Sequence, residues 1–493
     1  MQANVIKEKY VRVKESKAVR TINAFLSSPW GMAFFGVLTL VAYMFALEFY
    51  LWTFVVLTAI YVALFGEDFL PIMPLFMLCY VSPSLNNNPA KMENSIFLSG
   101  TDGIFIISIG GLAFAFFIAR ILLDKNMGLK KLFTMKREQA LGFLVLGGAF
   151  LLSGIGSPKY LETFWKNILV AIIEFLGFFF LYFFFSATVN WEKVKKEYFF
   201  WIGLIVALVV VGEVAHLYCT NDVLVNGSIK RGNIWTGWGT YNNVACVIVL
   251  GIPCAIYLSL NRKCGYVFIL LSAILLSATF ATGSRTACLV ACLVFFAGHI
   301  VAFVCNKDKR QYIPLAVLVV VGAGIGLCFF QEELTQLFAK IPHIIKPSVD
   351  GGIDWNDSNR INMYKKGWEY FLQYPIFGDS FYPSGWAPEL PWHVESFESN
   401  FPPRWHNTVI QMLASCGGVG FFAYAFHRFQ TVKTLLKRKN ITTTFIAITV
   451  LSLLAMSMLD CHLFNVGPTL FYSLALAFIE FLPKERKEKV EKN

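Results

Sequence analysis

Three residues of the sequence combine side-chain types suited to a phosphate-bearing substrate and an acid–base step. Arg285 stands in ATGSRTA, Arg360 in SNRINMYKKGW and His406 in PRWHNTVIQM. An arginine offers a planar fork of permanently charged donors that matches phosphate oxygens, whereas a neutral histidine accepts a proton near pH 7. The combination predicts chemistry in which a phosphate-bearing group leaves and a proton is taken up. Each residue also has a structural reading, as a snorkelling arginine, a solvated loop arginine and a helix-capping histidine.

Further polar residues are weaker candidates for the same chemistry. Asn242 and Asn243 open an apolar segment, where they cap a helix, bond across helices or contact a substrate, and Asn407 follows His406 directly. Asp460 and His462 bring an acid and a base to the short turn LDCHLF. Asn243 and Asn407 are therefore predicted to bind substrate beside the two arginines.

The elements that must position these residues are membrane helices. A composition of 56% hydrophobic and 15% charged residues, with 49 Phe, fits no soluble class. Apolar runs of about 17–25 residues, each able to cross the hydrocarbon core as a helix, recur along the chain. We predict an all-α polytopic membrane protein with about 14 transmembrane helices, in a range of 12–14. The expected spans are 30–47, 50–66, 68–83, 103–123, 139–157, 166–189, 198–217, 238–260, 265–281, 285–304, 312–330, 406–427, 441–458 and 464–482.

The distribution of the basic residues behind the net charge of +11 indicates the orientation of the chain in the membrane rather than nucleic-acid binding. Most of the 42 lysines and arginines fall in segments that share one side when the N-terminus is cytoplasmic. We therefore predict a multi-pass plasma-membrane protein with a cytoplasmic N-terminal segment (1–29), a cytoplasmic tail (483–493) and no nucleic-acid partner. The cytoplasmic connections are too short for a nucleotide-binding domain. No CxxC pair occurs, so neither a zinc site nor a disulfide framework is indicated. We predict no cofactor.

One external segment is far longer than an ordinary connection. Residues 331–405 separate eleven expected helices in 30–330 from three in 406–482, and a loop of this size usually carries function. Within it, RINMYKKGWEYFLQ predicts an amphipathic helix that ends before Pro375. Its apolar stripe is Ile361, Tyr364, Trp368 and Phe371.

Over about residues 235–430 the sequence resembles the O-antigen ligase and O-antigen polymerase (Wzy-type) membrane glycosyltransferases. The resemblance rests on the order and spacing of four pieces: WGTYNNVACVIVLGIP, ATGSRTA, RINMYKKGWEYFLQYPIFGDSF and WHNTVIQMLASCGGVGFF. The first 230 residues add only a matching topology.

The resemblance implies a C-type membrane glycosyltransferase-like fold and an active site on the outer face. The donor would be a glycan on undecaprenyl diphosphate, and the acceptor would be a hydroxyl on a glycan or lipid. Arg285 and Arg360 would hold the diphosphate, and His406 would act as general base or would itself bind the diphosphate. Such an enzyme would be inverting and metal-independent, and a chain-length regulator would be a further partner in polysaccharide biosynthesis.

Two questions stay open from the sequence. A ligase and a polymerase share the donor site and differ in the acceptor, and the motifs do not choose between them. The alternative class is a transporter or flippase for a polysaccharide precursor, which would show charges at mid-membrane and internal repeats. The spans carry few charges, apart from Glu174 and Glu213, and the chain shows no duplicated motif. The enzyme reading is therefore favoured.

Overall fold

The structure is a computed structural model, and nearly all of its regular structure is helical. It describes residues 10–78 apart from 11, 100–123, 136–158, 160–172 and 181–317 with short gaps, 355–381, and 405–483. In the first half the helices are α2 (Lys17–Leu26), α3 (Pro29–Phe45), α4 (Glu48–Phe65), α5 (Ile72–Leu78), α6 (Gly100–Leu123), α8 (Ala140–Leu151), α10 (Leu181–Thr188) and α11 (Tyr198–Thr220). Ser16 and Ser28 cap α2 and α3 by accepting a backbone N–H in the first turn.

The second half of the chain forms most of the packed helical bundle. Its helices are α12 (Tyr241–Ser259), α13 (Gly265–Ala281), α14 (Arg285–Cys305), η4 (Lys309–Tyr312), α17 (Trp355–Gln373), α19 (Thr408–Lys437), α20 (Ile441–Ser457), η5 (His462–Phe464) and α21 (Val466–Phe481). Between α11 and α12 lie two antiparallel hairpins and a short turn of helix. They are β1 (Leu224–Val225), β2 (Ser228–Ile229), η3 (Arg231–Asn233), β3 (Trp235–Thr236) and β4 (Gly239–Thr240).

The helices confirm an all-α polytopic membrane protein. Among the described residues, six helices are long and apolar enough to cross a membrane, or seven if the bent pair α2 and α3 is one span. Four shorter apolar helices are Ala140–Leu151, Gly265–Ala281, Ile441–Ser457 and Gly467–Phe481. The count of about fourteen stays a prediction, because the expected span 312–330 lies outside the described residues beyond 317, as do parts of 68–83 and 166–189.

Helix α12 forms the centre of the bundle. It packs against α11, α13, α14 and α20, and most of its side chains from Val244 to Ser259 are buried. A helix that is apolar on every side belongs in such a core rather than at a surface. Gly251 lets α12 approach α11 closely, because a Cβ there would lie 2.3 Å from the Ala207 Cβ atom.

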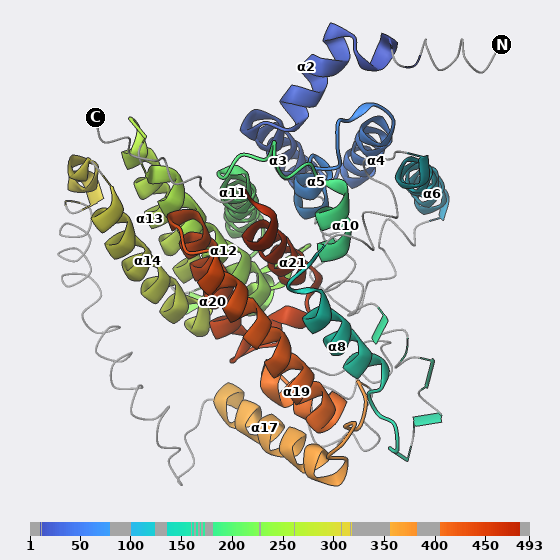
Figure 1. The fold of residues 1–493 in the computed structure, drawn as a ribbon. Coiled ribbons are helices and arrows are strands. Elements are labelled where there is room, and N and C mark those ends of the chain that lie inside the picture. The colour runs from blue at the N-terminus through green and yellow to red at the C-terminus, as the bar shows by residue number, and fades with distance from the viewer. Residues whose placement is uncertain are drawn as a thin grey trace, which may run out of the picture.

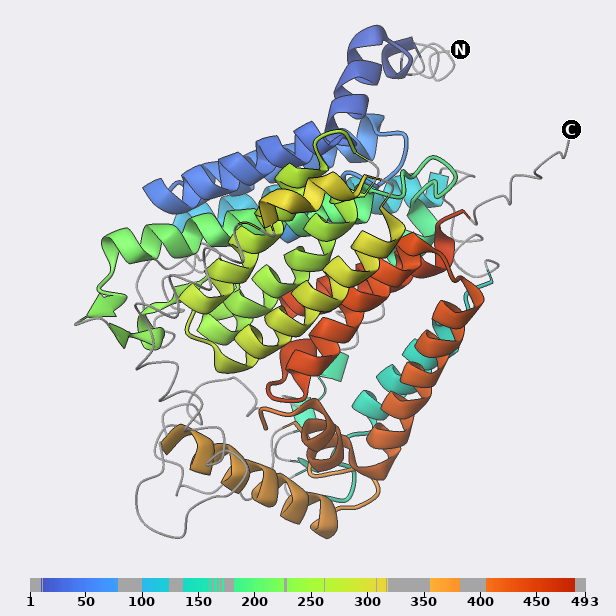
Figure 2. The ribbon, with the colours of Figure 1, turned by 90° about the vertical axis from the view of Figure 1, so that its left-hand side faces the viewer.

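Helix α19 differs from its expected span of 406–427. Gly417 has φ 64° and ψ −159°, which bends the helix sharply, and the straight part continues to Lys437 (Figure 2). The expected span stops directly before Arg428, and charges are rare within membrane spans. The structure accommodates this charge: the guanidinium lies 4.4 Å from the Tyr424 ring centroid and 4.7 Å from that of Tyr472.

Helix α17 lies across one end of the bundle, and α2 projects from the opposite end (Figures 1 and 2). The helix predicted within the long loop is therefore present, and it ends at Gln373, ahead of Pro375. Its buried face differs from the expected stripe: Met363, Gly367 and Tyr370 are buried, whereas Trp368 is 47% exposed. The remaining long-loop residues, 331–354 and 382–404, lie outside the described part.

Candidate active site

Four chain turns meet at the end of the bundle beside α17. They are the start of α12, the α13–α14 turn, the start of α19 and the turn between α20 and α21. Helices of an antiparallel bundle alternate in direction, so each of these turns reaches the same end although they are far apart in sequence. The predicted residues Asn243, Arg285, His406 and Asn407 all lie in these turns.

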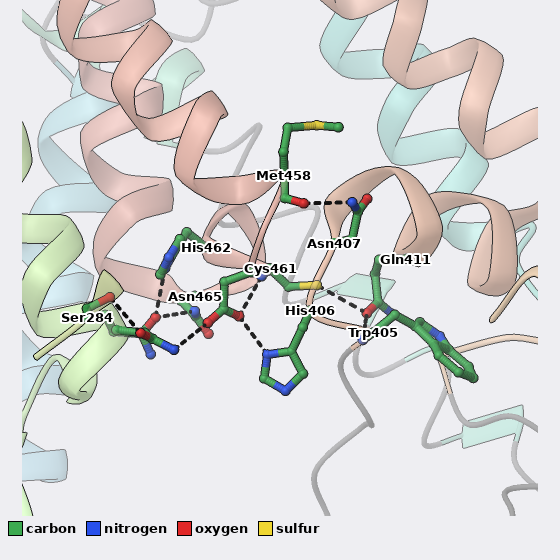
Figure 3. Close-up of polar contacts among 12 residues, drawn as sticks. Ser284, Trp405, His406, Asn407, Gln411, Met458, Cys461, His462 and Asn465 are labelled. Carbon is green, nitrogen blue, oxygen red and sulfur yellow. Dashed lines mark hydrogen bonds and ion pairs between the residues drawn. The ribbon is translucent and has the colours of Figure 1, made fainter. Parts of the chain in front are cut away.

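A chain of hydrogen bonds joins three of these turns to His406 (Figure 3). Ser284 Oγ donates to Asn242 Oδ1 at 2.8 Å, and Asn242 Nδ2 donates to Asp460 Oδ2 at 3.1 Å. The other Asp460 oxygen, Oδ1, lies 3.1 Å from His406 Nδ1. The GSR turn and the HN turn are thus connected through one carboxylate.

Asp460 is an ionised acceptor in this arrangement. Burial by itself would raise its pKa, but the hydrogen bond from His406, the proximity of both His462 and His406, and the hydrogen bond from the Cys461 backbone N–H hold the pKa well below the ordinary value. Because an ionised carboxylate can only accept, His406 Nδ1 carries the proton. The proton-accepting nitrogen of the neutral imidazole is then Nε2, as in a general base oriented by a carboxylate.

The backbone holds His406 in an uncommon conformation. Its φ is 50°, in the left-handed region that side chains other than Gly rarely adopt. Tyr364 of α17 donates its hydroxyl to the His406 carbonyl oxygen at 3.0 Å, and burial raises the pKa of Tyr364 to about 12, so this donor keeps its proton. The imidazole remains 25% exposed. Strain of this kind persists where the surroundings impose it, often at functional sites.

Asn407 and Asn243 use their side chains on the protein itself. Asn407 Oδ1 accepts from the backbone N–H groups of Val409 and Ile410, which caps α19, and its Nδ2 donates to the Met458 carbonyl at 2.7 Å. Asn243 Oδ1 accepts from His462 Nδ1 at 3.0 Å and from Asn465 Nδ2 at 2.8 Å. Both asparagines fix the turns around His406, and substrate binding by either stays a prediction.

The two predicted arginines reach this end from different elements. Arg285 is the first residue of α14 and is exposed. Arg360 is half-buried in α17, one turn before Tyr364. The pKa of His462 is lowered first by its burial and also by the charges of His406 and Arg360, which places the Arg360 charge within electrostatic reach of the His406 cluster.

Close packing against the first turns of α19 positions α17. A Cβ on Gly367 would lie 2.5 Å from Ile410 Cγ2 and 3.1 Å from Trp405 Cε3, so only glycine permits this contact. Trp405 is 1% exposed and its ring centroid lies 5.6 Å from that of Tyr370. Two of the family-like motifs, the one in α17 and the one that opens α19, are thus in direct contact.

The segment after α17 supplies backbone hydrogen-bond partners where α19 is broken. The bend at Gly417 leaves carbonyls of the preceding turn without helical partners, and Asp379 N–H and Ser380 N–H donate to the Ala414 and Ser415 carbonyls at 2.8 and 3.1 Å. In the other direction, the N–H of Gly418 donates to the Pro375 carbonyl at 2.8 Å. A polar backbone at membrane depth needs such partners.

The structure gives larger roles at this site to four residues than the sequence predicts: Asp460, His462, Asn242 and Ser284. In the sequence Asp460 and His462 are weak candidates, and Ser284 is not singled out. A short turn with an acid and a histidine after an apolar run was the available signal, but pairing it with His406 requires the fold. Within the described residues, no group of three or more His, Cys, Asp and Glu side chains is placed to hold a metal ion.

A helical membrane bundle with a carboxylate-oriented histidine and arginines at one end defines a polytopic membrane protein with the groups for acid–base transfer chemistry. Residues 267–425, from α13 into α19, match the family model described as O-antigen ligase. This part of the chain therefore carries an O-antigen ligase domain, and the resemblance found in the sequence is confirmed. The match supports a general O-antigen ligase or polymerase type of function and a glycosyltransferase-like activity. No curated protein matches the chain.

Proposed function

We propose that this protein transfers a glycan from undecaprenyl diphosphate to an acceptor hydroxyl at the outer face of the plasma membrane, in cell-surface polysaccharide biosynthesis. The observation that supports this most is the hydrogen-bonded series Ser284, Asn242, Asp460 and His406, which ties two family-like motifs to one histidine. In this proposal the series orients a general base, and Arg285 and Arg360 at the same end of the bundle supply guanidinium groups suited to a diphosphate.

The proposed reaction is a single displacement. The acceptor oxygen bonds to the anomeric carbon, the bond from that carbon to the diphosphate oxygen breaks, and the acceptor proton moves to His406 Nε2. Asp460 stabilises the imidazolium that forms without taking the proton itself. Displacement from the face opposite the leaving group inverts the anomeric carbon.

Arg285 and Arg360 hold the diphosphate in this proposal. Charge builds on the leaving oxygen as the bond breaks, and permanently charged guanidinium groups stabilise it without a metal ion. Asn243 and Asn407 support these contacts by fixing the turns around His406.

The charge distribution supports an outer location for this end. At the opposite end of the bundle, Arg262, Lys309 and Arg310 follow α12 and α14, and Lys437 and Arg438 end α19. Short basic loops stay cytoplasmic. We propose that 1–29 and 483–493 are cytoplasmic, that helices in 30–330 and 406–482 span the membrane, and that 331–405 contributes the catalytic loop. A glycan or lipid acceptor and a chain-length regulator are the proposed partners.

The test is transfer by purified protein supplied with an undecaprenyl-diphosphate glycan. Arg285→Ala, Arg360→Ala and His406→Ala should each abolish transfer while the protein stays inserted, and His216→Ala, a matched histidine near the end of α11, should transfer normally.

The product of the reaction separates the possible enzymes. Longer chains on the lipid would identify a polymerase, and a single transfer to a different acceptor would identify a ligase. Full activity in both arginine variants would contradict the proposal that Arg285 and Arg360 hold the diphosphate. Movement of the lipid-linked glycan across the bilayer without any new glycosidic bond would instead support the flippase alternative.

A further inference from the structure

The extension between α11 and α12 brings a third arginine to the turn that carries Arg285. Arg231 begins the short helix η3 between the two hairpins. Its side chain lies against Gly283, where a Cβ atom would be 3.1 Å from Arg231 Cγ and 3.2 Å from Nε. Gly283 is only two residues before Arg285, so the Arg231 side chain lies against the turn that carries Arg285.

Gly283 is suited to this contact in two ways. Its φ of +68° is a conformation that other residues rarely adopt, and its missing side chain leaves the space that the Arg231 stem occupies. The turn therefore both directs the chain into α14 and seats Arg231. An alanine here would strain the backbone and press on the arginine.

The extension that carries Arg231 is anchored on both sides. Ile234, directly after η3, is 1% exposed, and a Cβ at Gly467 would meet the Trp238 ring at 2.5 Å, so the β3–β4 hairpin packs closely on the start of α21. On the other side, Tyr218 Oη donates to the Ala281 carbonyl at 2.6 Å, which joins the end of α11 to the same turn as Gly283. Arg231 is thus held in place before any ligand binds, which lowers the entropic cost of binding.

The pair of arginines concentrates positive charge. Arg231 is half-buried and Arg285 is exposed, and within the described part of the chain no carboxylate pairs with the Arg231 guanidinium. Like charges held at one turn repel each other, and an anion placed between them relieves this repulsion. A dianionic or trianionic group gains more from such a pair than a monoanion does.

We propose that Arg231 is a further binding residue of this site, a third guanidinium that contacts the diphosphate of the lipid-linked donor from the side of the hairpins. This inference rests on the proposed function for the identity of the donor. It adds a residue outside the matched family domain, which begins at residue 267. Arg285 would contact the diphosphate from the start of α14, Arg231 from η3, and Arg360 from α17.

The test measures binding separately from turnover. Purified full-length protein in detergent is titrated with farnesyl diphosphate and with farnesyl monophosphate by isothermal calorimetry. Arg231→Gln should weaken diphosphate binding about tenfold, the loss expected for one charge-assisted hydrogen bond, and should weaken monophosphate binding less. Arg231→Lys should retain part of the affinity. Lys230→Gln removes the same charge from the adjacent exposed residue and should bind as wild type does.

Gly283→Ala offers an independent variant, because it displaces the Arg231 stem while it retains every charge. It should lower diphosphate affinity in the same direction as Arg231→Gln, with the protein still folded by its thermal transition. Binding by Arg231→Gln within twofold of wild type would overturn the proposal, and so would an equal loss in Lys230→Gln. If wild-type protein binds the diphosphate probe through Arg231 but transfers no glycan, the proposed function is wrong, whereas diphosphate binding by Arg231 is supported.

Discussion

At the scale of single residues, the His406–Asp460 pair controls which nitrogen of the imidazole can act. The carboxylate accepts from Nδ1 at 3.1 Å, and Asn242 and the Cys461 backbone N–H hold the carboxylate itself at 3.1 and 2.7 Å. The pair is therefore fixed from both sides, and in the proposed mechanism the nitrogen that takes up the proton is Nε2. A positioned base of this kind contributes about 10²- to 10⁴-fold to a rate.

Asp460→Asn should lower kcat by roughly a hundredfold or more, with little change in affinity for the diphosphate probe. An asparagine amide can donate to Nδ1, which moves the imidazole proton to Nε2 and removes the base. Steady-state transfer together with calorimetric binding would measure both effects. Asp222→Asn, an exposed acid on the same extension as Arg231, is the control and should be unaffected. A wild-type kcat for Asp460→Asn would exclude its positioning role.

His462 should make the folded protein sensitive to mild acid. Burial lowers its pKa, helped by the charges of His406 and Arg360 and opposed by Asp460. A base whose pKa is lower in the folded than in the unfolded state stabilises the fold above the unfolded value of about 6.5, and this stability is lost as the pH falls below it.

The melting temperature of wild-type protein should therefore fall between about pH 7 and pH 5, and that of His462→Gln should fall less. Glutamine can still donate to Asn243 but does not titrate. Thermal unfolding in detergent at a series of pH values measures the difference. Parallel curves for the two proteins would show that His462 does not carry this dependence.

At the scale of elements, the junction of α17 with the broken helix α19 positions the site. Gly367 allows α17 to touch Ile410 and Trp405, while the segment after α17 supplies N–H donors to the carbonyls freed by the bend at Gly417. Tyr364, on the same helix, bonds to the His406 carbonyl. A displacement of α17 would therefore reach His406 directly.

Gly367→Ala should reduce transfer at least tenfold although alanine favours an isolated helix by about 1 kcal/mol. The added Cβ would lie 2.5 Å from Ile410 Cγ2, which forces α17 away from α19. The matched control is Gly110→Ala in α6, a helical glycine with nothing within 4 Å of its Cβ position, which should transfer normally. Equal activity in both variants would show that the α17 contact does not position the site.

The sequence predicted these elements unevenly. The helix through RINMYKKGWEYFLQ and its end before Pro375 followed from helical spacing and the proline. Its buried face did not, because Met363, Gly367 and Tyr370 are buried by Trp405 and Ile410, residues about 40 positions away. The bend at Gly417 was missed for the same reason, since an apolar run containing three glycines is predicted as one helix until partners for its carbonyls are known.

At the scale of the whole molecule, the alternating directions of α12, α13, α14, α20 and α21 bring the turns of Asn243, Arg285 and Asp460 to the end where α17 lies, and many basic loops to the other end (Figure 2). The arrangement defines two ends of the bundle by geometry and charge. Native cysteines mark both: Cys219 ends α11 beside the hairpins, and Cys264 precedes α13 at the opposite end, and both thiols are exposed.

A membrane-impermeant maleimide should label Cys219 in intact spheroplasts and should label Cys264 only after permeabilisation. The proposed outer position of the site requires this order, because the two cysteines lie at opposite ends of the bundle. Peptide mapping by mass spectrometry would identify the labelled residue. Labelling of Cys264 before Cys219 would place the His406 end in the cytoplasm and remove the proposed donor chemistry.

By itself the sequence determined that the chain is a helical membrane protein, that a family-like order of motifs runs from the GSR turn to the HN turn, and that Arg285, Arg360 and His406 are chemically suited to a phosphate-bearing donor. Hydropathy, charge and local motifs report these properties because they depend on near neighbours in the chain. Only the tertiary structure decided that Asp460 orients His406, that Asn242 and Ser284 complete the series, and that Arg231 lies against Gly283. Those contacts join residues tens to hundreds of positions apart, and packing alone brings them within bonding distance.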